Sequence, residues 1–423
     1  MLTTTQIRAL TGTQVKAMNA SNLGNLTSVQ LAALTATQAA VLSTSQISNL
    51  TTNQLVGLAN TSVAALSTAQ MAAINSSKLA KMSSGQIRAM TTTQVAALST
   101  AQLSALTSDQ VSAMTAAQVS SLTTAGVAVL GNDAIASLTV AQAKALSTAQ
   151  IQSLTTAQVR QLSTVQVNAL TAVQIGAMET TDIKMFNADQ LQSISTEAVK
   201  SLTTAQLTSL TAEQVASLKS SQVKALSNNQ LQALTTAQVA ALSTDQVSAL
   251  TTAQIASIET ADLVSIKAEA LASLSTQQIR ALSNSQMAVL TGDQLSHLTT
   301  AQIANGLTTA QVMGINPNKL AYLSTDQIRV LTTTQVAALN SNALNSFNVD
   351  QISAMSTTQI RAISTASINT IDSKHLQAIG TAGIASLKTD QIARLTPQQI
   401  AQFSGEQIAS LTTSQIVALT TTQ

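Results

Sequence analysis

Residues 234–249 read LTTAQVAA LSTDQVSA, which is one eight-residue pattern written twice. From Leu2 onward an apolar residue returns at every eighth position, and after one additional residue, Gly306, the same spacing continues to Leu419. All 53 of these positions hold Leu, Met, Ile or Phe. We number each octad from this apolar residue, so its consensus is L-T/S-T-A-Q-V/I-x-A. The chain is therefore a tandem array, and its architecture follows from what one octad can form.

The composition is unlike that of an ordinary globular enzyme. Of 423 residues only 9% are charged and 1% aromatic, whereas soluble domains carry about 25% charged residues. Cysteine is absent, which excludes disulfides, thiolate catalysis and Cys-based metal sites. The net charge of +2 is too small for strong attraction to nucleic acid or anionic membranes. No apolar run is long enough to span a membrane, and residues 1–10 contain no signal-peptide core.

Neither an uninterrupted helix nor a strand suits the octad. Eight residues turn a helix by about 800°, so the apolar positions would spiral around its axis. In a strand, positions one and six would point to opposite faces. The pattern instead indicates a repeated helix start: Thr or Ser at position two is the N-cap, and Gln at position five, present in 38 of 52 complete octads, completes a capping box. Positions one and six, always apolar, are then the partners of a hydrophobic staple.

The placement of prolines and charges supports this interpretation. Pro317 and Pro397 both lie at position three, the first helical residue. Twelve of the 17 acids lie at position four, and 11 of the 19 bases lie at position seven, as the helix dipole favours. Asp326 and Arg329 are expected to form an ion pair three residues apart. Positions four and seven are thus the predicted solvent face, and positions one, six and eight the predicted buried face.

The predicted fold is all-α: an elongated solenoid of very short capped helices, each about five to seven residues long, with one helix per octad. Residues 1–423 are predicted to form a single continuous array without separate domains. Such helices are unstable alone, so stacking must supply the burial. The number of octads in one superhelical turn is left open. Gly306, the register shift, is interpreted as a loop insertion in left-handed conformation after a helix end, with a local bend as the alternative.

Two expectations concern glutamine. Replacing Gln158 by Ala should cost about 0.5–1 kcal/mol, since it removes half of one capping box. Fourteen octads lack Gln at position five, and they are interpreted as drift, with a longer superhelical period as the alternative.

No catalytic, cofactor-binding or metal-binding residue is predicted. The histidines, His297 and His375, lie 78 residues apart and have no ligands at suitable spacing. Two carboxylate pairs are interpreted as solvated helix starts, with a weak cation site as the alternative: Glu179 with Asp182, and Glu259 with Asp262. The four aromatic residues are interpreted as variation in the core: Phe186, Tyr322, Phe347 and Phe403.

The phrase LTTAQVAALST at residues 234–244, and more closely LTPQQI at 395–400, resembles the first helix of the DNA-binding repeat of TAL effectors. This resemblance covers one short helix. The repeat of about 34 residues with its base-reading loop is absent here, so it implies no DNA-reading residue.

The whole chain resembles the LTTAQV-type octapeptide arrays of very large bacterial surface or secreted proteins. That resemblance implies an extracellular or cell-surface location and a structural role. We therefore expect a stalk, filament or matrix element that is not an enzyme, associates with itself end to end, and has no cofactor, small-molecule substrate, nucleic-acid partner or transmembrane segment. Two alternatives stay open: an α-solenoid that binds nucleic acid or peptide, and an ice- or surface-binding threonine array.

Overall fold

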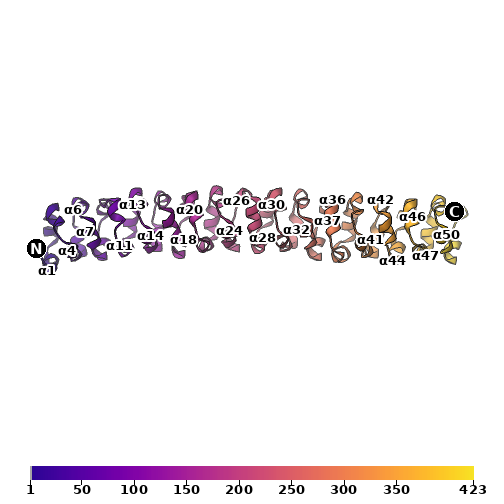
Figure 1. Ribbon diagram of the computed structural model, residues 1–423, viewed down its shortest axis with the longest axis horizontal. Coiled ribbons are helices and arrows are strands. Elements are labelled where there is room, and N and C mark those ends of the chain that lie inside the picture. Colours follow the sequence, from indigo (N-terminus) through magenta and orange to yellow (C-terminus); the bar gives the residue numbers. More distant parts are fainter. Residues whose placement is uncertain (1) are drawn as a thin grey trace. The chain divides into compact units, whose positions relative to one another are not determined.

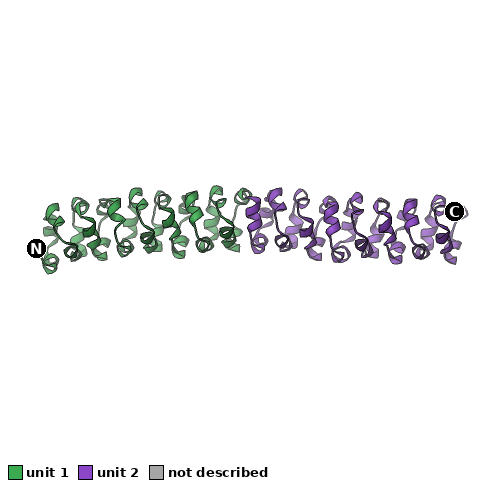
Figure 2. Ribbon diagram, in the orientation of Figure 1, with its two compact units in different colours: residues 1–210 green, residues 211–423 purple. Residues whose placement is uncertain are grey.

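The computed structural model describes residues 2–423, which form 51 α-helices and one π-helix and contain no strand. The helices group into two compact units, Met1–Leu210 and Thr211–Gln423 (Figure 2). In each unit the short helices follow one another in chain order as a stack of turns (Figure 1). None of the described helices is both long and apolar enough to cross a lipid bilayer.

The helices of the first unit share a length of four to six residues. They are α1 (Thr4–Ala9), α2 (Gly12–Ala17), α3 (Ala20–Gly24), α4 (Ser28–Ala32), α5 (Ala36–Ala40), α6 (Thr44–Asn49), α7 (Thr52–Gly57), α8 (Asn60–Ala64), α9 (Thr68–Ala72), α10 (Ser76–Leu79), α11 (Ser84–Ala89), α12 (Thr92–Ala96), α13 (Thr100–Ser104), α14 (Ser108–Ala113), α15 (Ala116–Ser120), α16 (Thr124–Ala128), α17 (Asn132–Ala136), α18 (Val140–Ala145), α19 (Thr148–Gln152), α20 (Thr156–Gln161), α21 (Thr164–Ala169), α22 (Ala172–Ala177), α23 (Thr180–Ile183), α24 (Ala188–Ser193), α25 (Thr196–Val199) and α26 (Thr204–Ser209).

The second unit repeats the arrangement and contains the π-helix, η1. Its helices are α27 (Ala212–Ser217), α28 (Ser220–Ala225), α29 (Asn228–Gln232), α30 (Thr236–Ala240), α31 (Thr244–Ser248), α32 (Thr252–Ser257), α33 (Thr260–Leu263), α34 (Ala268–Ala272), α35 (Thr276–Ala281), α36 (Asn284–Val289), α37 (Gly292–His297), η1 (Gln302–Gly306), α38 (Thr309–Gly314), α39 (Pro317–Leu320), α40 (Thr325–Arg329), α41 (Thr333–Ala338), α42 (Ser341–Ser346), α43 (Val349–Ser353), α44 (Thr357–Ala362), α45 (Thr365–Ile368), α46 (Ser373–Ala378), α47 (Thr381–Ser386), α48 (Thr389–Arg394), α49 (Pro397–Ile400), α50 (Gly405–Ala409) and α51 (Thr413–Ala418).

Most octads with Gln at position five start their helix with the predicted capping box, as α20 illustrates. The N-cap Thr155 has an extended backbone, and its hydroxyl accepts a hydrogen bond from the Gln158 backbone N–H at 3.2 Å. The Gln158 side-chain oxygen accepts from the Thr155 N–H at 2.8 Å. The helix ends at Gln161, and its C-cap is Leu162, the apolar residue of the next octad (φ −59°, ψ 127°). The prediction of one short capped helix per octad is confirmed, although the helices are slightly shorter than expected.

Three octads make one turn of the solenoid. Within the first unit α4 packs against α7, α5 against α8, and α15 against α18. Within the second unit α31 packs against α34, α34 against α37, and α44 against α47. Within each unit, most helices contact the third helix before or after them, so residues 24 apart in sequence occupy equivalent places in successive turns. The all-α solenoid is confirmed, while a single array without separate domains stays a prediction.

The buried face differs from the prediction at one position. Positions one and six are buried as expected, for example Leu154 and Val159, which are 4% and 0% exposed. Position eight, however, is half-exposed or exposed in nearly all octads, with Ala33 and Ala169 as its buried members. It lies over position three of the turn before: a Cβ on Gly57 would come within 2.7 Å of the Ser28 carbonyl oxygen. Small residues at position eight therefore permit close approach between turns. The interior contains the side chains of position five, where the sequence had predicted those of position eight.

Gly306 is accommodated differently from the prediction. The additional residue widens one helix turn into η1, in which the Leu307 N–H donates to the Gln302 carbonyl five residues earlier at 3.0 Å. Gly306 is buried, and no described residue has positive φ, so neither the loop nor the left-handed conformation is present. A Cβ on Gly306 would lie 3.2 Å from Ile279 Cγ2, which explains why the smallest residue stands there. A single-residue insertion within a helix is the usual origin of a π-bulge.

Candidate functional site

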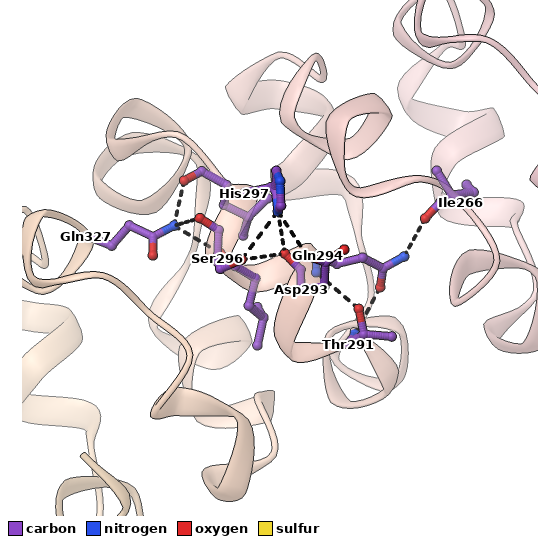
Figure 3. Close-up of polar contacts among 9 residues, drawn as sticks. Ile266, Thr291, Asp293, Gln294, Ser296, His297 and Gln327 are labelled. Atoms are coloured by element: carbon purple, nitrogen blue, oxygen red, sulfur yellow. Dashed lines mark hydrogen bonds and ion pairs between the residues drawn. The ribbon is translucent and has the colours of Figure 1, made fainter. Parts of the chain in front are cut away.

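The most frequent polar site in the structure is the glutamine at position five, shown by Gln294 in Figure 3. Its side-chain oxygen accepts a hydrogen bond from the Thr291 backbone N–H at 3.0 Å. Its Nε2 donates to two carbonyl oxygens of the turn before, those of Ile266 at 2.8 Å and Leu263 at 2.9 Å. The side chain is buried, and one amide group thus joins two turns. We call this arrangement the glutamine clamp.

The clamp satisfies the carbonyl of the apolar residue that follows a short helix, here Ile266, and gives a second donor to the Leu263 carbonyl, which already accepts from the Ile266 N–H at 3.2 Å. The last carbonyls of every helix have no acceptor role inside that helix, and an unpaired buried carbonyl is costly. Leu263 is the last residue of α33, and Ile266 is the apolar residue that follows it in the next octad. Because each octad ends a helix, each octad offers acceptors for one such donor. In regular octads the acceptors lie 31 and 28 residues before the glutamine, as for Gln158 with Val127 (3.0 Å) and Leu130 (2.8 Å).

The sequence predicts the role of this amide oxygen but not the role of its nitrogen. A capping box accepts Glu as readily as Gln at this position, because only the side-chain oxygen is used. Here 38 octads have Gln at position five and none has Glu. That one-sided choice was the available signal for a donor. Gln158 is 0% exposed and also lies 3.4 Å from the Ala128 carbonyl, so it is more than half of one capping box.

Several octads without Gln keep a donor at position five. Their contacts to the turn before are Ser62 Oγ to the Leu34 carbonyl (2.8 Å), Ser367 Oγ to the Leu339 carbonyl (3.0 Å), Lys319 Nζ to the Leu290 carbonyl (2.6 Å) and His375 Nε2 with the Phe347 carbonyl (2.8 Å). Interpreting all fourteen octads as drift is therefore wrong for these members. They replace one donor by another of different shape.

His297 lies beside serine and aspartate, but the geometry does not suit nucleophilic catalysis. Its Nδ1 is 2.9 Å from the Asp293 carbonyl oxygen, 3.4 Å from the Asp293 carboxylate and 3.3 Å from Ser296 Oγ (Figure 3). A serine–histidine–aspartate relay needs the two partners on opposite ring nitrogens. Here both partners meet the same nitrogen, and all three residues are exposed side chains of α37.

His375 is the buried histidine. Its Nε2 occupies the place of the clamp donor, while its Nδ1 is buried without a hydrogen-bond partner and lies 3.9 Å from the Asp372 carboxylate. One imidazole and one carboxylate are too few for a closed metal site. Within residues 2–423 no group of three or more His, Cys, Asp or Glu side chains could hold a metal ion.

The carboxylate pairs are not the solvated helix starts that the sequence suggested. Asp182 and Asp262 occupy position five and are 3% and 6% exposed, whereas Glu179 and Glu259 at position two are exposed. Burial, and then the nearby Glu179 charge, raise the pKa of Asp182 to about 6. The Asp262 carboxylate accepts a hydrogen bond from the Thr236 hydroxyl at 2.8 Å.

The aromatic residues divide into two groups. Phe186, Phe347 and Phe403 are buried at position one, as expected of core residues. Tyr322 is 61% exposed, so its assignment to the core is wrong. Its ring lies over Gly292 of the turn before, where a Cβ would come within 2.5 Å of the ring.

One surface hollow of the first unit has a volume of about 730 Å³. It is lined by Ser28, Thr52, Asn53, Val56, Gly57, Ser77 and Lys81. These residues provide one cation, neutral hydroxyl and amide groups and no carboxylate. The hollow therefore carries no pair of groups for acid–base chemistry.

Comparison with known proteins identifies the repeat. A family model described as the ALTTAQ repeat matches residues 79–116, 140–172, 175–212, 223–258, 255–292, 305–341 and 368–405. No curated protein matches the chain. Among solved structures, the leucine-rich repeat-containing protein LegL7 from Legionella pneumophila is 14% identical, with 65% of this chain and 80% of that chain covered and a TM-score of 0.13.

Proposed function

Because this chain belongs to the ALTTAQ repeat family, we propose that it is a structural repeat protein, a stalk, filament or matrix element of a bacterial surface. The proposed role is non-enzymatic and places the chain outside the cell or at its surface. The single observation that carries the proposal is the glutamine clamp. The same contact closes turn after turn in both units, so length is gained by adding equivalent turns, as suits a spacer.

The proposal includes end-to-end association between copies of this array. In the turn made by α1, α2 and α3, Gln6 and Gln14 keep their capping boxes, but within residues 2–423 their Nε2 groups have no preceding turn to contact. In the turn made by α49, α50 and α51, the carbonyls of Leu411 and Leu419 stand at the acceptor position of the clamp. Donors at one end thus match acceptors at the other. Such a contact is heterologous and does not close on itself, so repetition yields open filaments.

Sedimentation and electron microscopy of a polypeptide of residues 1–423 test this association. We expect fibres that grow with protein concentration. In the double variant Gln6→Glu and Gln14→Glu, the donors become carboxylates that face carbonyl oxygens, and fibres should be lost. The matched control, Thr5→Glu with Thr13→Glu, adds the same two charges at the exposed position four of the same octads and should still assemble. Fibres that persist in the first variant would show that assembly uses another surface.

The alternatives are separated by two further measurements. A binding solenoid should retard nucleic acid in a mobility-shift titration, with affinity falling steeply as salt rises. A threonine array that binds ice should produce thermal hysteresis. Two of the bases at position seven are already engaged within the protein: Arg280 Nη2 donates to the Asn305 carbonyl at 2.7 Å, and Arg329 pairs with Asp326 at 2.9 Å. Neither alternative has a specific structural observation in its favour.

A further inference from the structure

Two octads place an acid where the clamp needs a donor. Asp182 and Asp262 stand at position five, and the clamp register assigns to Asp182 the carbonyls of Ile151 and Leu154, which lie 31 and 28 residues earlier. An ionised carboxylate only accepts hydrogen bonds, so it cannot pair with a carbonyl oxygen. A protonated carboxyl group has one O–H donor. The protonation state of Asp182 therefore decides whether this turn is clamped.

Serine shows that a side chain as short as aspartate reaches the acceptor. Ser62 Oγ and Ser367 Oγ each lie within 3.0 Å of the carbonyl 28 residues earlier. An aspartate has its oxygens one bond further from the backbone than serine does. A protonated Asp182 in the same register can thus donate to the Leu154 carbonyl without displacement of the backbone.

We propose that Asp182 is a proton-dependent clamp, which holds α23 to the turn before it in the protonated state and releases it in the ionised state. The solenoid then opens first at α23 as pH rises. This inference concerns residues within the first unit and is independent of the proposed association between copies.

The charged groups around Asp182 agree with this assignment. In its own octad, Glu179 is an exposed like charge that disfavours ionisation, and Lys184 stands at the exposed position seven. Of the two helices packed against α23, α20 contributes Arg160, whose Nη2 contacts Met185 Sδ at 3.0 Å, and α26 contains no charged residue. Burial is the first cause of the raised pKa, about 6.

The direction of the pH effect follows from the raised pKa. The folded state binds the proton more tightly than the unfolded state, whose aspartate titrates near 3.8. The stabilisation is therefore fully present below about pH 4 and is lost as pH rises through about 6. Between about pH 5 and pH 7.5 the opening equilibrium should shift by about tenfold, because each pKa unit corresponds to a factor of ten.

Amide hydrogen exchange of the full chain, read by mass spectrometry on the segment 180–185, tests the proposal. After correction for the intrinsic exchange rate, the protection of this segment should fall about tenfold between about pH 5 and pH 7.5. Asp182→Asn supplies an N–H donor at all pH values, so this segment should become as protected at the higher pH as at the lower. Direct NMR titration of the Asp182 carboxyl group should give a midpoint near 6.

Asp262→Asn is the matched control. It makes the same substitution at the same octad position, but in the native chain Thr236 already donates to that carboxylate. We expect little change in the pH dependence of the segment 260–265. An unchanged pH response in Asp182→Asn, or an equal response in Asp262→Asn, would overturn the assignment, as would an Asp182 midpoint near 4.

Discussion

Gln302, which precedes Gly306, and Gln311, which follows it, make the same clamp at different sequence spacings. Gln302 Nε2 lies 2.7 Å from the Leu274 carbonyl, 28 residues earlier, and Gln311 Nε2 lies 2.7 Å from the Leu282 carbonyl, 29 residues earlier. The additional residue is taken up by η1, and the donor–acceptor distance is unchanged. The comparison shows that the solenoid preserves the clamp rather than the octad count, and that a helix can widen locally to do so.

The largest expected loss of stability is the same in both regions and comes from a charge at position one. Leu154→Asp in a regular turn and Leu307→Asp beside η1 each bury a charge without a partner at position one, where the wild-type residues are 4% and 5% exposed. Each should cost about 4 kcal/mol or more and disrupt the octads three before and three after. Urea unfolding followed by circular dichroism gives the loss. Leu154→Met, which keeps the volume, should cost less than about 1.5 kcal/mol. Equal stability of Leu154→Asp and Leu154→Met would remove position one from the core.

The second largest expected loss of stability comes from removal of a clamp glutamine in each of the two regions. Gln158→Ala and Gln311→Ala each remove one cap and leave one buried carbonyl, that of Leu130 or Leu282, without its donor. The Val127 and Ile279 carbonyls keep a backbone donor, so each variant should cost about 2–3 kcal/mol. Thr155→Ala removes only a cap and should cost about 1 kcal/mol. The measurement is the free energy of unfolding of the three variants. If Gln158→Ala proved as mild as Thr155→Ala, the hydrogen bonds between turns would contribute nothing net.

A smaller effect concerns Gly306 alone. Gly306→Ala should destabilise by about 1 kcal/mol, because its Cβ would press on Ile279 Cγ2 at 3.2 Å. Deleting Gly306 should restore an α-helical turn and regular spacing, and we expect stability equal to or slightly above wild type. Thermal melts of the two variants compare insertion and deletion directly. A strongly destabilised deletion variant would mean that the octads after Gly306 depend on the π-helix.

The smallest effect lies on the exposed face. Arg329→Ala removes the ion pair with Asp326, which is 2.9 Å long but exposed on both sides. We expect a loss of less than about 0.5 kcal/mol that shrinks further at high salt. Unfolding at low and high salt measures it. A salt-independent loss larger than that of Thr155→Ala would contradict the assignment of positions four and seven to the solvent face.

The local part of the fold was predictable from the sequence because its signals lie within one octad. The cap at Thr155, the box completed by Gln158 and the ion pair of Asp326 with Arg329 all join residues at most three apart. The number of octads per turn was not predictable. It depends on hydrogen bonds between residues that lie 28 or 31 positions apart, and periodicity alone does not reveal these pairs. The π-helix was not predicted for a related reason. A glycine after a helix usually ends that helix, and only the packing of Gly306 against Ile279 shows that the helix continues through it.

Because three octads make one turn, a change in the number of octads rotates the side chains that follow it around the local solenoid axis. Loss or gain of a single octad would leave every core position and every clamp intact, yet would turn all following side chains by one third of a revolution around the local axis. Loss or gain of three octads would shift them along that axis without rotation. Recombination among such near-identical segments can therefore rearrange which surface residues align in a row while the interior stays the same, so that the count of octads, rather than substitution, sets the pattern displayed to the surroundings.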